Sequence, residues 1–408
     1  MDNPHRLLFL DPGHFHAALT LRVPHPRVAD DIVVYAPDGP ERRDFLALVD
    51  RFNGRGTAWR VEVVTTDDPL GRIIDERRGD VVVLAGRNGG KARTMRRLHD
   101  AGFHVLADKP WLVEPGDLAE IRASLAGPPV AMEIMTGRHD LGGRLLKRIV
   151  ESPEVFGAFR ADGLAIESDS VHHLEKLVDG APLRRPWWYF DVRVQGSGIV
   201  DIPTHLVDQS QWLTERAAPN AVPALLSARL SSTRVPLDAF RRVTGEARVP
   251  GALEPVVKDG ALDLQCNGEL TYQLGDVVAR GTIRWDVAPP PGGGDTSRLI
   301  VRGTRADVMR EQRRVFVTLH EPNTRALADL VASWQKEFPG VWLEGDGARD
   351  EVVVPAALDA GHEAHFALVL DMFLRAVDDK SARTDAAART LAKYTLLQEA
   401  LRWTSLSP

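Results

Sequence analysis

Short apolar segments alternate with longer polar segments over the first third of the chain. Each apolar segment has the length of a buried strand, and helical patterns lie between them. Strands are predicted at residues 6–10, 31–35, 60–64, 80–84, 103–106 and 129–135. This alternation is typical of a doubly wound sheet of parallel strands. We therefore expect a first domain of this α/β type over residues 1–136.

The pattern changes after about Thr136, where longer amphipathic segments begin. Extended segments are predicted at 262–274, 277–287, 298–301 and 314–320, and helices at 362–377 and 384–403. The extended segments indicate an open, largely antiparallel sheet. The stretch 288–297 is rich in proline and glycine, which favours a surface loop between two strands. We expect a second, α+β domain over 137–408 that includes the C-terminal helices.

Composition narrows the class of protein. A chain of 408 residues that is 44% hydrophobic can bury a large core and divide into two domains. Its net charge of -6 gives no basic field for nucleic acid. Cys266 is the only cysteine, so an internal disulfide and a cysteine metal cluster are excluded. The apolar run 7–10 is too short for a signal peptide, and no membrane span follows. We expect a cytoplasmic enzyme without nucleic-acid or membrane partners.

A candidate for proton transfer lies between Gly198 and Trp212. Asp201, His205, Asp208 and Trp212 fall on one face of a helix whose first residue is Pro203. Histidine titrates nearest neutrality, and neighbouring carboxylates adjust its proton affinity, which suits a general acid or base. The same pattern also fits a helix cap, a buried core histidine and a packing tryptophan.

A second candidate is the lysine that ends a predicted strand, in the run Val105-Leu106-Ala107-Asp108-Lys109-Pro110. In an α/β sheet, the carboxyl ends of the strands border the crevice where ligands bind. Pro110 also restricts the backbone of Lys109 to extended geometry. A Lys-Pro dipeptide by itself is also typical of a turn.

Taken together, Lys109, Asp201, His205 and the N-terminal pattern resemble the Gfo/Idh/MocA family of nicotinamide-dependent sugar oxidoreductases. Members carry a Glu-Lys-Pro signature after the fifth strand and an Asp-x-x-x-His pair in the second domain, and Asp108 stands here in place of the glutamate. Further segments resemble the family's second-domain sheet (154–157, 299–309) or a subgroup known as "putative oxidoreductases" with a distinct C-terminal domain (11–18, 171–173, 186–191, 204–208, 361–366).

The resemblance implies a Rossmann-like nucleotide-binding domain followed by a largely antiparallel open-sheet domain for substrate and oligomerisation. We therefore expect NAD or NADP as cofactor and a homo-oligomer, either a dimer or a tetramer. Residues expected to bind the cofactor are Gly13, His14, Phe15, His16, Asp38, Ala85, Gly86, Asn88 and Lys109.

The expected nucleotide loop departs from the usual glycine pattern. Of the Gly-x-Gly-x-x-Gly motif only the middle glycine, Gly13, is present, while Asp11 adds negative charge and Pro12 removes a backbone donor. His14 and His16 fit either phosphate contacts or partly buried residues at a helix start. After the second strand, Asp38 fits a ribose-binding acid, whereas Arg42 and Arg43 fit the extra phosphate of NADP, so the choice of cofactor stays open.

Substrate recognition is expected from the second domain. The candidate residues are Arg138, His172, His173, Trp187, Trp188, Tyr189 and Asp208. Aromatic faces pack on sugar C–H surfaces, and polar side chains bind hydroxyls, although half of the aromatic run 187–190 is expected in the core. His362 and His365 have helical spacing that could place two metal ligands together, but a solvated helix start is favoured, and no metal is expected.

The implied reaction is hydride transfer from a sugar carbinol to the nicotinamide. His205 would remove the hydroxyl proton, Lys109 would hydrogen-bond the same oxygen, and Asp201 would orient the imidazole. The formal base, Lys109 or His205, stays open. Two alternatives are a glycosidase that uses tightly held NAD for a transient oxidation, and a sensor without catalysis, which only the eroded glycine loop supports.

Overall fold

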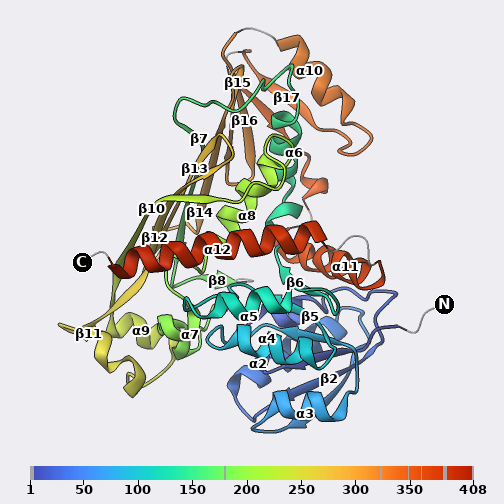
Figure 1. Ribbon diagram of the computed structural model, residues 1–408, viewed down its shortest axis with the longest axis vertical. Coiled ribbons are helices and arrows are strands. Elements are labelled where there is room, and N and C mark those ends of the chain that lie inside the picture. The colour runs from blue at the N-terminus through green and yellow to red at the C-terminus, as the bar shows by residue number, and fades with distance from the viewer. Residues whose placement is uncertain are drawn as a thin grey trace. The chain divides into compact units, whose positions relative to one another are not determined.

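The computed structural model describes residues 4–178, 181–321, 324–347, 349–359, 361–379 and 384–406 (Figure 1). The chain forms two compact units. Unit 1 contains residues 1–136, 193–196 and 361–398, and unit 2 contains 137–192, 197–360 and 399–408. The segment 361–398, which the sequence analysis assigned to the second domain, thus packs with the first. The domain boundary at residue 136 itself stays a prediction.

Unit 1 is built on a six-stranded parallel sheet in the order β3-β2-β1-β4-β5-β6. The strands are β1 (Leu7–Leu10), β2 (Asp31–Ala36), β3 (Arg60–Thr65), β4 (Val81–Leu84), β5 (His104–Asp108) and β6 (Ala131–Ile134). The central strands β1 and β4 are buried along their whole length, as expected where helices cover both faces of a parallel sheet. The Rossmann-like prediction is confirmed.

Helices connect these strands, and two C-terminal helices complete the unit. They are α1 (His16–Leu19), α2 (Pro40–Asn53), α3 (Pro69–Glu76), α4 (Lys91–Asp100), α5 (Asp117–Ser124), α11 (His365–Asp378) and α12 (Thr384–Leu406), the last reaching into unit 2. The short α7 (Val192–Gln195) lies almost wholly in unit 1. Among the residues that the structure describes, no helix is long and apolar enough to cross a membrane.

Helix α11 joins the hydrophobic core of the nucleotide-type sheet. Its buried residues Phe366, Val369, Leu370 and Phe373 recur at helical spacing, so they form one apolar stripe. This stripe belongs to the same core cluster as Phe9 of β1. The burial of four large side chains explains why this helix packs with unit 1 although it lies more than two hundred residues after β6.

Helix α12 is fixed to unit 1 by a buried charge. Lys393 is 1% exposed and forms an ion pair with Glu133 of β6, and the Tyr394 hydroxyl donates to the same carboxylate. The Tyr394 ring stacks on Trp111 at 5.8 Å, and its oxygen accepts the Trp111 backbone N–H. Burial and the nearby Glu133 carboxylate raise the pKa of Tyr394 well above its usual value. A carboxylate this deep is tolerated because each of its oxygens has a donor.

Unit 2 is built on a ten-stranded sheet in the order β10-β12-β13-β7-β14-β15-β16-β18-β17, with β11 beside β12 (Figure 1). Its strands are β7 (Leu164–His173), β10 (Ala224–Pro236), β11 (Val257–Lys258), β12 (Ala261–Leu274), β13 (Val277–Asp286), β14 (Thr296–Arg302), β15 (Ala306–Glu311), β16 (Arg314–Leu319), β17 (Trp342–Gly345) and β18 (Arg349–Val353). All neighbours are antiparallel except β7 and β13, so the predicted largely antiparallel sheet is confirmed.

The remaining elements of unit 2 are short strands and helices. They are η1 (Gly137–His139), α6 (Leu141–Val150), β8 (Leu177–Val178), β9 (Ala181–Pro182), η2 (Trp187–Phe190), α8 (Pro203–Thr214), α9 (Leu237–Thr244), η3 (Gly251–Val256), α10 (Thr324–Ser333) and η4 (Ala356–Leu358). Helix α8 packs closely on the sheet at Gly281, where a Cβ atom would lie 2.9 Å from the Leu206 side chain. Residues 287–295 connect β13 to β14, so the loop predicted at 288–297 is confirmed except for 296 and 297, which begin β14.

The first prediction concerns the buried ion pair that holds α12. Lys393→Met should lower the free energy of unfolding by about 3–5 kcal/mol, because the Glu133 carboxylate is left buried without its cation. The double variant Lys393→Met/Glu133→Gln should lose less, since no charge remains. Chemical denaturation measures both, with Lys258→Met, an exposed lysine, as the control. Equal losses in the single and double variants would contradict a charge-based anchor.

Candidate functional site

A buried carboxylate organises the carboxyl ends of the strands in unit 1. Asp108, the last residue of β5, is 3% exposed. Its Oδ2 lies 2.9 Å from His14 Nδ1 and 3.0 Å from His16 Nδ1, and its Oδ1 lies 3.1 Å from His16 Nδ1. The two imidazole rings meet edge to face with centroids 4.1 Å apart. The loop after β1 and the end of β5 are therefore joined through one side chain.

The protonation states of this cluster follow from its burial and hydrogen bonds. Burial alone would raise the pKa of Asp108, but the two imidazoles outweigh it and hold that pKa well below its usual value. Burial lowers the pKa of His16 to about 4, with Asp108 opposing the shift in part. At neutral pH the carboxylate is ionised and His16 is neutral. Since a carboxylate only accepts, the hydrogen-bond pattern assigns the His16 hydrogen to Nδ1.

Two lysines lie next to this carboxylate along the chain or in space. Lys109 is 9% exposed, and its backbone N–H donates to Asp108 Oδ1 at 2.9 Å. Lys91 is 2% exposed, and its Nζ donates to the Asp108 carbonyl at 2.7 Å and to Asn88 Oδ1 at 2.5 Å. Sequence reasoning missed Lys91. The available signal was a cation in the first turn of a helix, where the helix dipole disfavours positive charge.

Two backbone N–H groups of the expected nucleotide loop form hydrogen bonds within the protein. The amides of Gly13 and His14 both donate to the Ala85 carbonyl, at 3.2 and 3.0 Å. A Cβ atom at Gly86 would lie 2.5 Å from the Asp11 carbonyl, so the close approach of the two loops requires glycine there. Phe15 precedes the four-residue helix α1, and its ring contacts those of His14 and His16. A phosphate at this loop would rely on side chains more than on amides.

Other expected cofactor residues are paired with neighbours. Asp38 forms ion pairs with Arg42 and Arg43, so the acid expected for NAD and the arginines expected for NADP neutralise one another. Asp11 pairs with Arg87 at 3.2 Å, although burial raises the pKa of Asp11 overall. The Asn88 amide donates to the Gln195 carbonyl at 2.8 Å, which ties residues 193–196 to unit 1.

In unit 2, helix α8 carries the predicted proton-transfer residues. Pro203 is its first residue, as predicted, and the N-cap position belongs to Ile202. Asp201 and Asp208 are 6% and 7% exposed, whereas His205 is partly exposed. The Asp208 carboxylate accepts two hydrogen bonds from the Arg138 guanidinium, from Nε and from Nη2, each 2.8 Å long. This two-point geometry fixes the Arg138 guanidinium beside α8.

A second histidine cluster lies at the end of β7. Asp295 accepts from Lys176 at 2.6 Å, and its oxygens lie 3.4 Å from His172 Nδ1 and 3.3 Å from His173 Nδ1. Ser170 Oγ lies 2.7 Å from His172 Nε2. Burial alone would raise the pKa of Asp295, but His172 and Lys176 together lower it below its usual value. Asp295 was missed because its proline- and glycine-rich surroundings indicated only a surface loop.

Comparison with known proteins places the chain in a family. The family described as "Putative oxidoreductase C terminal domain" matches residues 145–405. The chain belongs to this family of oxidoreductases. A crystal structure of a putative oxidoreductase from Parabacteroides merdae is 34% identical, with a TM-score of 0.91 over 99% of this chain and 98% of that one. A comparison with curated proteins gives no match.

More distant structures share the fold of this oxidoreductase. GenD2 from gentamicin A biosynthesis, in complex with NAD, is 15% identical with a TM-score of 0.62 over 100% of this chain and 95% of that one. Levoglucosan dehydrogenase, in complex with NADH and L-sorbose, is 16% identical with a TM-score of 0.62 over 99% and 98%. The predicted membership of a subgroup of putative oxidoreductases with a distinct C-terminal domain is confirmed.

The aromatic run of the oxidoreductase divides as the sequence analysis expected. Trp188 and Phe190 are 1% and 2% exposed, so they belong to the core, and Trp188 has no free surface for the substrate contact predicted for it. Trp187 and Tyr189 are partly buried. The Arg185 guanidinium lies over the Tyr189 ring at 4.4 Å, and burial raises the pKa of that tyrosine. Of the three aromatic residues predicted to contact substrate, Trp187 and Tyr189 therefore remain candidates.

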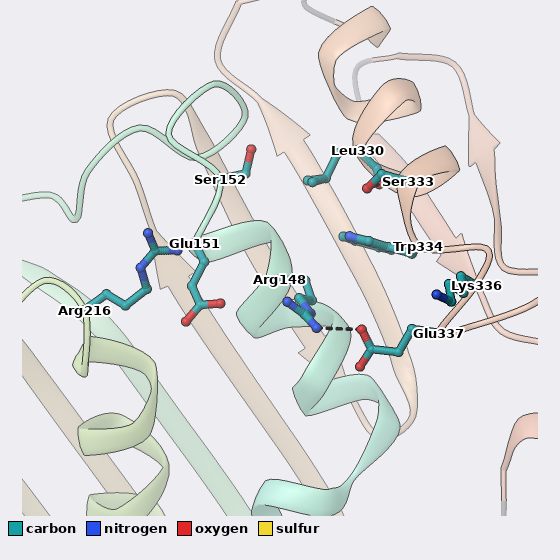
Figure 2. Close-up of a pocket in the computed structure, with 9 residues that line it drawn as sticks. All are labelled: Arg148, Glu151, Ser152, Arg216, Leu330, Ser333, Trp334, Lys336 and Glu337. Atoms are coloured by element: carbon teal, nitrogen blue, oxygen red, sulfur yellow. Dashed lines mark hydrogen bonds and ion pairs between the residues drawn. The ribbon is translucent and has the colours of Figure 1, made fainter.

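A hollow of about 680 Å³ lies elsewhere in unit 2, between α6 and α10. Figure 2 shows the Trp334 ring extending toward α6, and Arg148 paired with Glu337 at 2.5 Å. None of the predicted site residues lines it. Its lining holds the charged side chains of Glu151, Lys336 and Glu337 and no histidine.

The pH dependence of folding should report on His16. Unfolded His16 binds a proton near pH 6.5, but the folded residue does so only near pH 4. Its contribution therefore makes folding less favourable as the pH falls through this window. His16→Gln removes that contribution, so its stability deficit relative to wild type should shrink from about pH 7 to about pH 4.5, as measured by urea unfolding. A deficit that stays constant over this range would contradict a buried neutral His16.

Proposed function

We propose that this oxidoreductase transfers hydride between NAD or NADP and a secondary hydroxyl of a sugar or glycoside. The observation that carries the proposal is Lys109, buried at the carboxyl end of β5 directly after the anchored Asp108. In a doubly wound parallel sheet, ligands bind at the carboxyl ends of the strands. Support also comes from two relatives in fold whose structures hold NAD or NADH, one of them with a sugar.

The cofactor accepts or supplies the hydride, and the protein manages the proton and the position of the reacting oxygen. Lys109 donates a hydrogen bond to that oxygen, and because charge develops there as hydride leaves, a fixed ammonium stabilises the transition state more than the ground state. The formal base that takes the hydroxyl proton is either His205 or Lys109, and Asp201 orients the His205 imidazole.

The cofactor residues in this proposal are those of the nucleotide loop and its neighbours. Gly86 allows the loops after β1 and β4 to meet, and the side chain of His14 remains 28% exposed. Since the Gly13 and His14 amides donate to the Ala85 carbonyl, contacts to phosphate fall to the His14 and His16 side chains, and the Phe15 ring packs against both. The proposal includes both NAD and NADP, because Asp38, which would favour NAD, forms ion pairs with two arginines that would favour NADP.

The substrate residues in this proposal come from unit 2. His172, with Ser170 and Asp295 on its two nitrogens, is held in a fixed orientation for hydroxyl recognition. Tyr189 and Trp187 offer aromatic faces at the edge of the core. The remaining predicted substrate residues position their neighbours; they are Arg138, His173 and Asp208.

A redox-assisted glycosidase is the alternative, because it would use the same residues. In that reaction the enzyme oxidises one hydroxyl, the new ketone acidifies the adjacent C–H, elimination breaks the glycosidic bond, and the hydride returns. A sensor without catalysis is less well supported, since it has no need of Lys109 together with Asp201 and His205.

A substrate panel tests the proposed function. Glucosides, free hexoses, inositols and sugar acids are incubated with NAD or NADP, with absorbance for NADH and chromatography for products. A keto-sugar formed together with equal NADH supports the dehydrogenase, and released sugar without net NADH supports the glycosidase. Absence of NAD and NADP binding at millimolar concentration in calorimetry would refute the proposed hydride transfer. Turnover of non-carbohydrate substrates alone would overturn the proposed substrate class.

Single substitutions test the assigned roles. Lys109→Ala and His205→Ala should each lower kcat by at least about a hundredfold, the usual contribution of a positioned acid or base. Asp201→Asn should have a milder effect, because an amide of the same shape can still accept a hydrogen bond from an imidazole. Circular dichroism and thermal unfolding check that each variant folds. A folded variant with near wild-type kcat would show that the substituted residue is structural.

A further inference from the structure

One set of side chains in unit 1 has the composition of a metal site. Among the residues that the structure describes, only His14, His16 and Asp108 form a group of three metal-ligating side chains with donor atoms all within 4.8 Å of one another. His14 and His16 stand 92 or more residues before the aspartate that they meet, so the sequence does not reveal this grouping, and no metal is expected from it.

We propose that His14, His16 and Asp108 bind one divalent transition-metal ion. Two imidazole nitrogens and one carboxylate oxygen are a ligand set found in catalytic sites, where the remaining positions stay open to water or substrate. This set favours ions such as Zn²⁺, Co²⁺ or Fe²⁺ over Mg²⁺, which prefers oxygen ligands alone and keeps its waters. The proposal goes beyond the proposed function and does not depend on it.

Two of the three distances between donor atoms are close to the spacing that such an ion needs. Zinc bonds to nitrogen and oxygen of about 2.0–2.2 Å place neighbouring donor atoms roughly 3–3.5 Å apart. Here His14 Nδ1 and His16 Nδ1 lie 2.9 and 3.0 Å from Asp108 Oδ2. All three donor atoms lie within 4.8 Å of one another, so one ion can contact all of them after a small rearrangement of the side chains. It would replace the two ring hydrogens, which move to the Nε2 atoms.

The surroundings hold these ligands in place. The Lys109 backbone N–H donates to Asp108 Oδ1, so the carboxylate has a fixed orientation. The Phe366 ring contacts His16 with centroids 4.7 Å apart, which restricts that imidazole. Hydrogen bonds to the ligands themselves are the usual support of a metal site.

A second histidine and aspartate cluster provides an internal contrast. His172, His173 and Asp295 have the same residue types, but the Lys176 ammonium already lies 2.6 Å from Asp295 Oδ2. The two imidazole nitrogens are also farther from the carboxylate, at 3.4 and 3.3 Å. A cation of the protein thus already pairs with the carboxylate that a metal would need, so this cluster serves as the matched control.

Zinc titration of the chelator-treated full chain tests the proposal. Calorimetry should show about one Zn²⁺ bound per chain, and His14→Ala and Asp108→Asn should each weaken binding by more than about a hundredfold, since loss of an outer-shell partner alone costs 10–100-fold. His172→Ala should bind like wild type. Co²⁺ bound to wild type should give a visible absorption band. Added Zn²⁺ should abolish this band by displacing Co²⁺, and added Mg²⁺ should leave it unchanged.

The outcomes separate this proposal from the proposed function. Absence of saturable Zn²⁺ binding, or folded His14→Ala and Asp108→Asn variants that bind as wild type does, would overturn the metal site while NAD binding and turnover could still be measured. Asp108→Asn removes a buried charge and could unfold the protein. His14→Ala changes a side chain that is 28% exposed, so circular dichroism is expected to show a folded variant in which the comparison holds.

Discussion

The buried charge of Asp108 is the constraint on which the candidate chemistry of unit 1 depends. An ionised carboxylate that is 3% exposed must be compensated locally, because its transfer from water costs several kcal/mol. Compensation comes from the imidazoles of His14 and His16 and from the Lys109 backbone amide. The same requirement therefore sets the path of the loop after β1 and holds the backbone of the lysine that we assign to the reacting oxygen.

Glu133 places a second buried carboxylate on the neighbouring strand. Residue 133 of β6 lies opposite Ala107 of β5 in the parallel register, one position before Asp108. Its partners are Lys393 and Tyr394 of α12, nearly the whole chain away from the loop that compensates Asp108. Two adjacent strands thus fix one segment from each end of the chain. Hydrophobic burial of α11 beside β5 and β6 also holds the C-terminal segment to this sheet, which is why residues 361–398 complete unit 1.

The sequence predicts the strands of unit 1 well because strands buried on both faces are continuous apolar runs. It also places Pro203 at the start of α8 and half of the aromatic run in the core. It does not predict contacts between distant residues: His16 meets Asp108 across 92 positions, and His173 meets Asp295 across 122. Periodicity describes the face on which a side chain lies, but not the partner it finds there. For that reason Asp108, Lys91 and Asp295 were missed as organising residues.

The eroded glycine motif has a physical counterpart in the structure. In the usual loop, glycines leave backbone amides free for a pyrophosphate. Here the amides of Gly13 and His14 are satisfied by the Ala85 carbonyl, and Gly86 allows that approach. Restoring glycines at positions 11 and 16 would not free these amides, because their acceptor lies on the loop after β4. In the function that we propose, the side chains of His14 and His16 supply what the backbone does not, and their hydrogen bonds to Asp108 join this loop to the strand that carries Lys109.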